Sequence, residues 1–251
     1  MKFRTICRLL YLKRARHRRG HGIHSPFLFR LITTVVEDKH RYPEYGIYKE
    51  LKNKALNLLH NYPDSSLARI FQHYSLSHSR KLYQKIELPN RYAKVVFRLI
   101  REFKPSSILS YGPTLGVSLA LMAMANRNNP IYQVVADPED EVFSKELLRN
   151  SGFSNILFLP EDVGLTVIPD FVMINYPDCP EQLKLVIKNT LEKHSDDGVL
   201  VISGIHESKE MQKIWQEVIA SECVHVSLDF FEIGIVLFRK GLQKENFIHR
   251  F

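Results

Sequence analysis

Residues 108–126, ILSYGPTLGVSLALMAMAN, decide the expected fold. A short apolar run, Ile108 to Tyr111, leads into the turn Gly112-Pro113-Thr114-Leu115-Gly116, and an apolar helical stretch follows from Val117 to Asn126. This pattern predicts a strand, a tight turn and a helix, the unit from which parallel sheets are built. Ligands of such sheets bind beyond the carboxyl ends of the strands. The glycines favour close approach of the backbone to a ligand, although a tight turn without a ligand has the same pattern.

The alternation of strands and helices continues through residues 105–251. The last two expected strands are joined too tightly for a parallel crossover, so they must pair antiparallel. The sequence therefore predicts an α/β fold whose seven-stranded sheet is mostly parallel with an antiparallel last strand. Besides 108–111, strands are expected at 132–136, 156–159, 171–174, 199–202, 224–230 and 234–239, and helices at 139–150, 181–194 and 209–221.

Residues 1–104 have helical periodicity instead. Ser25 followed by Pro26 is typical of a helix start, because serine caps the first turn and proline tolerates its first position. We therefore expect a basic arm and helical region over 1–104, followed by the sheet domain over 105–251. The expected helices of the first region cover 1–16, 27–36, 44–60, 77–86 and 89–103.

The positive charge of the chain is concentrated near its start. The chain has 35 Lys and Arg against 27 Asp and Glu, a formal net charge of +8, and the first acid is Glu37. Residues 1–19 therefore predict an anionic partner, either RNA or lipid headgroups. A solvated charged helix docked by its apolar side is the alternative. The rest of the chain has no strand face of basic and aromatic residues for stacking bases, which argues against a dedicated RNA-binding module.

Composition and cysteine spacing exclude several classes of protein. With 45% hydrophobic and 25% charged residues, the chain is neither disordered nor fibrous. Cys7, Cys179 and Cys223 form no C-x-x-C pair, so neither a zinc ribbon nor a disulfide scaffold is indicated. No apolar run is long enough to span a membrane, and no cleavage site follows the first residues. We expect a cytoplasmic protein without a transmembrane segment.

Acidic residues follow two of the expected strands. Asp137 ends the second strand, where an acid accepts hydrogen bonds from the ribose hydroxyls of an adenosine cofactor. Capping of the next helix is the alternative role. Asp162, beside Glu161 after the third strand, is placed to read an adenine amino group or to be a solvated loop acid.

The glycine turn, the acid after the second strand and the antiparallel hairpin together resemble the class I S-adenosylmethionine-dependent methyltransferase fold. A closer resemblance, to a bacterial branch of class I methyltransferase-like proteins, extends over essentially the whole chain. It is most specific at residues 20–27, GHGIHSPF, and around His206. The resemblance implies a Rossmann-like cofactor domain over 105–251, with S-adenosylmethionine as cofactor. The residues it places at the cofactor are Ser110, Tyr111, Gly112, Pro113, Thr114, Gly116, Asp137, Asp162 and Asn175.

The resemblance also implies that His206 faces the methyl acceptor. A histidine there suits a general base, since its unperturbed pKa lies near neutrality. A packing or capping histidine at the sheet edge is the alternative.

The chain departs from that branch at three acidic positions. Ser110 stands where the first strand carries a glutamate, Asn175 where the fourth carries an aspartate, and Ser203-Gly204 where the fifth carries two aspartates. Loss of the first acid weakens the complement to the ammonium group of the cofactor, because charged hydrogen bonds are the stronger ones. Loss of the others removes the oxygen ligands of a magnesium or calcium site, so no metal is expected.

Two functions follow from these residues. The first is a methyltransferase that uses S-adenosylmethionine and acts on an unidentified acceptor. The second is a degenerate relative without catalysis that serves as a binding or interaction protein. Other classes fit poorly, since the turn is G-x-x-x-G instead of the dinucleotide fingerprint, and the chain has neither a G-x-S-x-G elbow nor a phosphate-binding G-K-[ST] motif.

Overall fold

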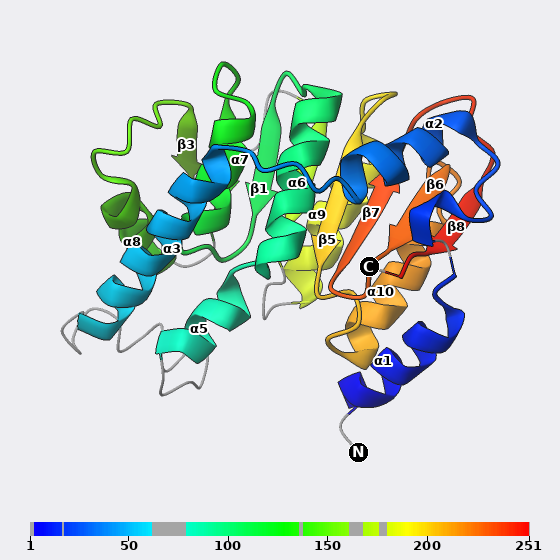
Figure 1. Cartoon of the computed structure of the whole chain (residues 1–251), viewed down its shortest axis with the longest axis horizontal. Coiled ribbons are helices and arrows are strands. Elements are labelled where there is room, and N and C mark those ends of the chain that lie inside the picture. Colours follow the sequence, from blue (N-terminus) through cyan, green and yellow to red (C-terminus); the bar gives the residue numbers. More distant parts are fainter. Residues whose placement is uncertain are drawn as a thin grey trace. The chain divides into compact units, whose positions relative to one another are not determined.

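A computed structural model of the chain describes residues 3–16, 18–61, 79–135, 138–160, 168–175 and 180–250, which form two compact units (Figure 1). Unit 1 comprises Met1–Lys39, Pro105–Ile108 and Leu165–Phe251, and unit 2 comprises His40–Lys104 and Leu109–Gly164. Each unit takes residues from both sides of position 104, and the domain boundary expected there stays a prediction.

Unit 2 contains the strand–turn–helix segment with which the sequence analysis began. Its strands lie in the order β3-β2-β1, and β2 pairs parallel with β3, with Ile131 opposite Ile156. Every residue of α7 from Val117 to Met124 is buried, as expected for a helix that is apolar on all sides. The elements are α3 (Glu44–Asn61), α5 (Ser79–Ile86), α6 (Asn90–Phe103), β1 (Ile108–Tyr111, its first residue in unit 1), α7 (Val117–Ala125), β2 (Ile131–Val134), α8 (Pro138–Leu148) and β3 (Ile156–Leu159).

Unit 1 contains the other strands, in the order β4-β5-β7-β6-β8. Strands β4 and β5 are parallel, β7 is antiparallel to both β5 and β6, and β8 is parallel to β6. Its elements are α1 (Phe3–Arg14), a 3-10 turn (Arg18–Gly20), α2 (Pro26–Arg30), a π-helical turn (Leu31–Val36), β4 (Phe171–Ile174), α9 (Pro180–Glu192), β5 (Val199–Ser203), α10 (Lys209–Ala220), β6 (Val226–Asp229), β7 (Ile233–Leu237) and β8 (Glu245–Ile248).

The α/β fold, with its mostly parallel strands and antiparallel hairpin, is confirmed. The strand β8 is additional to the seven that we expected. Its four residues are too few and too polar for a recognisable alternation, and only Phe247 is buried. The strand forms because the edge of β6 offers a hydrogen-bonding ladder, with Val226 opposite Glu245. Its existence therefore depends on tertiary pairing.

The predicted cap at Ser25 is present, since its hydroxyl accepts a hydrogen bond from the Leu28 amide. The helix after it continues to Val36 as expected, but its last six residues form a π-helical turn. Thr33 and Thr34 donate their hydroxyls to the carbonyls of Phe29 and Arg30, which competes with the regular backbone ladder. Among the described residues, no helix is both long and apolar enough to cross a membrane.

Gly234 in β7 gives a test of the packing of unit 1. A Cβ there would lie 2.6 Å from two ring atoms of Trp215, which is buried on α10. We expect Gly234→Ala to lower the free energy of unfolding by about 1–3 kcal/mol, because the indole must shift within a filled core. Gly46→Ala, at an exposed helical position with open space around it, should raise stability by about 0.5–1 kcal/mol. Urea denaturation of both variants checks this, and equal stabilities would contradict the packing.

Candidate functional site

The glycine turn joins β1 to α7 within unit 2. Gly112 has φ of 100° and Gly116 has φ of 89°, a region that side chains disfavour. A Cβ on Gly116 would lie 3.4 Å from the backbone of Ser144 on α8. Glycine is therefore favoured at this position by the direction of the chain, whereas a Cβ would make only an ordinary contact with α8.

Most polar groups of the turn are bonded within the protein. The Gln133 amide donates to the carbonyls of Gly112 and Val134, at 2.9 and 3.1 Å. The Ser144 hydroxyl donates to the Thr114 carbonyl at 2.8 Å, and the Thr114 hydroxyl accepts from the Gly116 amide at 2.9 Å. Thr114, which the resemblance places at the cofactor, thus braces the turn itself.

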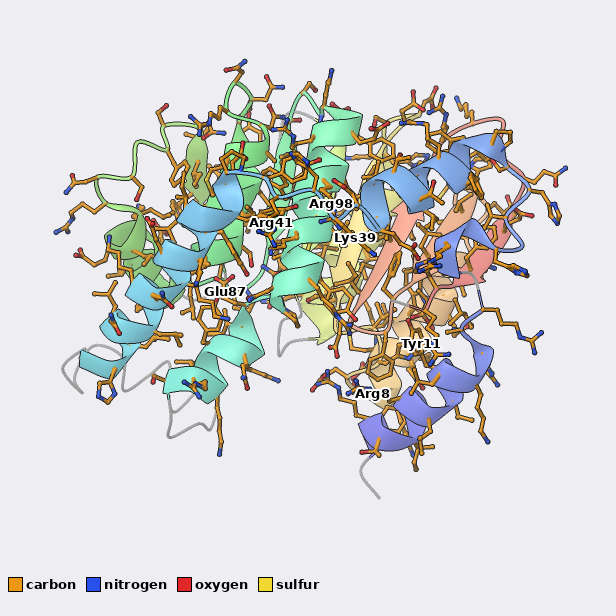
Figure 2. The ribbon with its side chains drawn as sticks, viewed as in Figure 1. Arg8, Tyr11, Lys39, Arg41, Glu87 and Arg98 are labelled. Atoms are coloured by element: carbon orange, nitrogen blue, oxygen red, sulfur yellow. The ribbon has the colours of Figure 1, made fainter. Side chains whose placement is uncertain are left out.

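A buried carboxylate at the start of α7 is the main feature that the sequence analysis missed. Glu87, only 4% exposed, lies on the segment between α5 and α6 (Figure 2). One of its oxygens accepts from the amides of Leu115 and Val117, at 2.9 and 3.2 Å. The other accepts from both the amide and the hydroxyl of Ser118, at 2.8 and 2.5 Å. The amides that a bound anion would use are therefore already occupied.

This arrangement is electrostatically consistent. The first amides of a helix have no partner within the helix and carry partial positive charge, so a carboxylate is stabilised there. Burial, and with it the nearby Glu87 charge, raises the pKa of both Tyr48 and Tyr83 above the usual value for tyrosine. The only sequence signal for Glu87 was an acid between two apolar residues, Ile86 and Leu88.

The other residues that the resemblance places at the cofactor do not all lie in the same unit, and two of them lie outside the described residues. Ser110, Tyr111 and Pro113 are buried beside the glycines in unit 2, and the Ser110 hydroxyl has no hydrogen-bond partner within the described part of the chain. Asn175 is buried directly after β4 in unit 1. Asp137 and Asp162 lie outside the described residues, so their roles stay predictions.

His206 lies in unit 1, three residues after β5, and both of its ring nitrogens have partners. Nε2 is 2.8 Å from a carboxylate oxygen of Asp229, and Nδ1 is 2.9 Å from the amide nitrogen of Gln212. The ring stacks on Phe231 with centroids 5.1 Å apart. A neutral imidazole that donates from Nε2 and accepts at Nδ1 satisfies both contacts. Neither Asp229 nor Gln212 was assigned a role from sequence.

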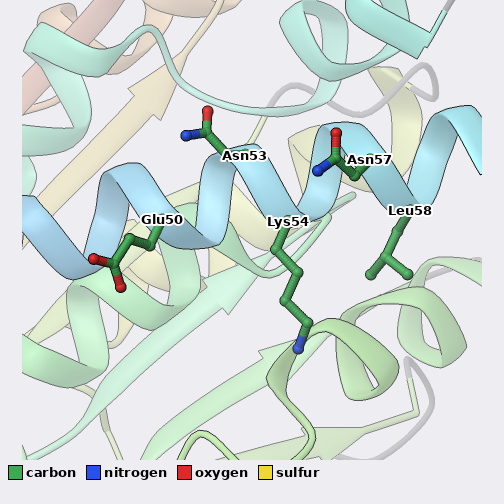
Figure 3. Close-up of a pocket in the computed structure, with 5 residues that line it drawn as sticks. All are labelled: Glu50, Asn53, Lys54, Asn57 and Leu58. Carbon is green, nitrogen blue, oxygen red and sulfur yellow. The ribbon is translucent and has the colours of Figure 1, made fainter.

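Among the described residues, no three His, Cys, Asp or Glu side chains are grouped to hold a metal ion. A pocket beside α3 is lined by one helix alone, and its lysine, Lys54, donates to the Leu147 carbonyl at 2.7 Å (Figure 3). The residues that line it are Glu50, Asn53, Lys54, Asn57 and Leu58.

Comparison with solved structures shows the fold. The O-methyltransferase TomG from Streptomyces achromogenes, in complex with SAM, matches with a TM-score of 0.53 and 11% identity over 76% of this chain and 98% of its own. The SAH-bound methyltransferase PaMTH1 from Podospora anserina matches with 0.53 and 12% over 79% and 97%. An O-methyltransferase from Bacillus cereus in complex with SAH matches with 0.51 and 11% over 76% and 99%. No protein-family model and no curated protein matches. The chain therefore has the fold of S-adenosylmethionine-dependent methyltransferases.

The methionine tail of S-adenosylmethionine carries an ammonium group and a carboxylate. The residues of the glycine turn fit the ammonium group better than the carboxylate. An ammonium group needs acceptors, and the Glu87 carboxylate supplies a negative charge near the turn that Ser110 lacks. A carboxylate needs donors, and the amides of Leu115, Val117 and Ser118 already donate to Glu87. A bound tail must therefore either direct its carboxylate away from α7 or displace Glu87.

Removal of the Glu87 side chain tests its structural role. We expect Glu87→Ala to lower the free energy of unfolding by about 3 kcal/mol, because buried amides lose a charged acceptor. Glu50→Ala, at an exposed position of α3, is the matched control and should change stability by less than about 0.5 kcal/mol. Chemical denaturation measures both. A loss no larger than that of the control would show that the α7 amides do not depend on Glu87.

Alkaline pH tests the environment of Tyr83. Because its pKa is raised in the folded state, the unfolded chain loses this proton first, and stability should fall as pH rises above about 10. Tyr83→Phe should remove about 1.4 kcal/mol per pH unit from that slope. Urea denaturation at a series of pH values above 9 measures the slope, and an unchanged slope in the variant would contradict the assignment.

Proposed function

We propose that the chain is an S-adenosylmethionine-dependent methyltransferase whose cofactor binds at the carboxyl end of β1 in unit 2. The glycine turn supports this most strongly. Gly112 and Gly116 have positive φ angles and no side chains, and they follow β1 at the end of the strand where ligands of open α/β sheets bind. Of the solved proteins of the same fold, TomG is in complex with SAM, and the Bacillus cereus O-methyltransferase is in complex with SAH. The methyl acceptor is unidentified.

In this function the chain mainly positions the reactants. When bound, S-adenosylmethionine supplies an electrophilic methyl group. Gly112 and Gly116 allow the backbone to approach the cofactor, Asp137 is proposed to accept from the ribose hydroxyls, and Asp162 from the adenine amino group. Holding the acceptor in line contributes most of the rate, since orientation converts a bimolecular step into a unimolecular one.

His206 is the proposed general base for an acceptor that carries a proton. Because Asp229 holds Nε2, the proton would be taken at Nδ1, and the amide of Gln212 must first release that nitrogen. Asp229 would stabilise the imidazolium that forms. Gln212 is therefore a positioning residue in this proposal.

A non-catalytic binding protein is the second candidate, and two observations favour it. The carboxylate of Glu87 occupies the amides at the start of α7, and both nitrogens of His206 are engaged. Such a protein keeps the fold while it binds the cofactor weakly or not at all.

Calorimetric titration separates the two candidates. S-adenosylhomocysteine carries the amino-acid tail, whereas 5′-methylthioadenosine lacks it. We expect the wild-type protein to bind both ligands, and Glu87→Gln to change the affinity for S-adenosylhomocysteine alone by about tenfold, or about 1.4 kcal/mol, because only this ligand carries the charged tail groups that interact with the Glu87 carboxylate.

Glu50→Gln is the matched control and should leave both affinities unchanged. The absence of heat and of thermal stabilisation with either ligand at millimolar concentration, in the wild type and in Glu87→Gln, would contradict the methyltransferase proposal and favour the binding protein.

A further inference from the structure

Helix α1 has two unlike faces, and one of them packs on the rest of unit 1 beside α10 (Figures 1 and 2). Cys7, Tyr11 and Ala15 are buried there against Phe231. The Tyr11 hydroxyl donates to the His249 carbonyl, and the Arg16 amide donates to the Ile248 carbonyl at 3.2 Å. These contacts fix which side of α1 faces the protein.

Arg4 reinforces this docking. Its guanidinium lies 2.6 Å from Glu207 and 2.6 Å from Glu232, two acids of unit 1. Arg4 also lies over the Phe231 ring, 5.9 Å from its centroid. Arg4 therefore pairs with acids within the protein. The anionic partner expected for residues 1–19 would have to contact the other cations of α1.

The opposite face of α1 is apolar and exposed. Ile6, Leu9, Leu10 and Leu12 are between 42% and 50% exposed. Ten large apolar side chains are exposed among the described residues, and four of them lie within these seven positions of one helix. Single exposed apolar residues are ordinary on protein surfaces, whereas a cluster indicates an interaction site.

Cations flank this apolar face. At 100° per residue, Arg8 lies between Ala15 of the docked face and Leu12, and Arg14 lies on the other edge of the docked face, between Cys7 and Phe3 and about 40° from Leu10. Both are exposed, as is Lys13 within the apolar face itself. The chain has no acid before Glu37 that could oppose an anionic surface. Long basic side chains extend their charges to the headgroup level while their stems cover apolar surface.

We propose that α1 lies in the surface of an anionic lipid bilayer, with Ile6, Leu9, Leu10 and Leu12 among the acyl chains and Arg8, Lys13 and Arg14 at the headgroup phosphates. An apolar face bordered by cations is the pattern of helices that lie in the plane of a membrane interface. The docked face holds α1 on the rest of unit 1 while the exposed face lies in lipid. Binding therefore also orients unit 1 relative to the membrane.

RNA fits the same face less well. Phosphates would use the cations, but four exposed aliphatic side chains have no role in a phosphate contact. Single-stranded bases stack on aromatic rings, and the aromatic residues of the described helix, Phe3 and Tyr11, pack on the docked side. The aliphatic side chains therefore decide between the two anionic partners.

Sedimentation of the full chain with lipid vesicles tests this proposal. The protein should bind vesicles of phosphatidylglycerol mixed with phosphatidylcholine about tenfold or more tightly than vesicles of phosphatidylcholine alone, and added salt should weaken the binding. The double variant Leu9→Gln/Leu10→Gln should lose about tenfold or more of this affinity, because both apolar side chains leave the lipid. Both positions are exposed, so thermal melting should match that of the wild type.

The matched control carries the same changes elsewhere, as Val142→Gln/Leu185→Gln, at two residues that are 59% and 60% exposed. It should bind vesicles as the wild type does. Three outcomes would overturn the proposal: no binding of the wild type to anionic vesicles, undiminished binding of Leu9→Gln/Leu10→Gln, or self-association of the wild type that this variant abolishes. Binding of an unstructured RNA in place of vesicles, with loss only in Arg8→Gln/Lys13→Gln, would assign the face to RNA.

Discussion

The contact between the Glu87 carboxylate and the first amides of α7 is the constraint on which the candidate site depends. The glycine turn aims these amides at one point, and the start of a helix can bind an external anion in this way. Here the chain supplies its own anion, held by four donors from Leu115, Val117 and Ser118. The start of α7 is therefore stable without a ligand, and any ligand with an acidic group meets a negative charge there.

The Glu87 carboxylate compensates for the absence of an acid at Ser110. From sequence alone, the neutral Ser110 side chain is a loss of the charge that faces an ammonium group. Glu87 returns a carboxylate to the same turn, from the segment between α5 and α6. The turn therefore contains a carboxylate, although the first strand carries no acid. The Glu87 carboxylate would attract a cationic group of a ligand and would repel a carboxylate.

Sequence reasoning succeeded where structure follows from local pattern. The strands from Ile108 and Phe171, the cap at Ser25 and the antiparallel pair of β6 and β7 each depend on a few neighbouring residues, and all were predicted. The strand β8 was missed because its pairing with β6 supplies what its own polar residues do not. Glu87, 28 residues from Leu115, and Asp229, 23 residues from His206, became partners only through the tertiary fold. A single sequence does not indicate which acid folds onto which donor.

Amide hydrogen exchange at the start of α7 tests directly whether the Glu87 carboxylate holds the first amides of this helix. The first amides of a helix ordinarily exchange fast, since they lack partners within the helix. We expect the amides of Val117 and Ser118 to be protected in the wild-type protein without any ligand, and Glu87→Gln to lower their protection while the middle of α7 is unchanged. Fast exchange of both amides in the wild-type protein, or equal protection in the variant, would contradict the role of Glu87.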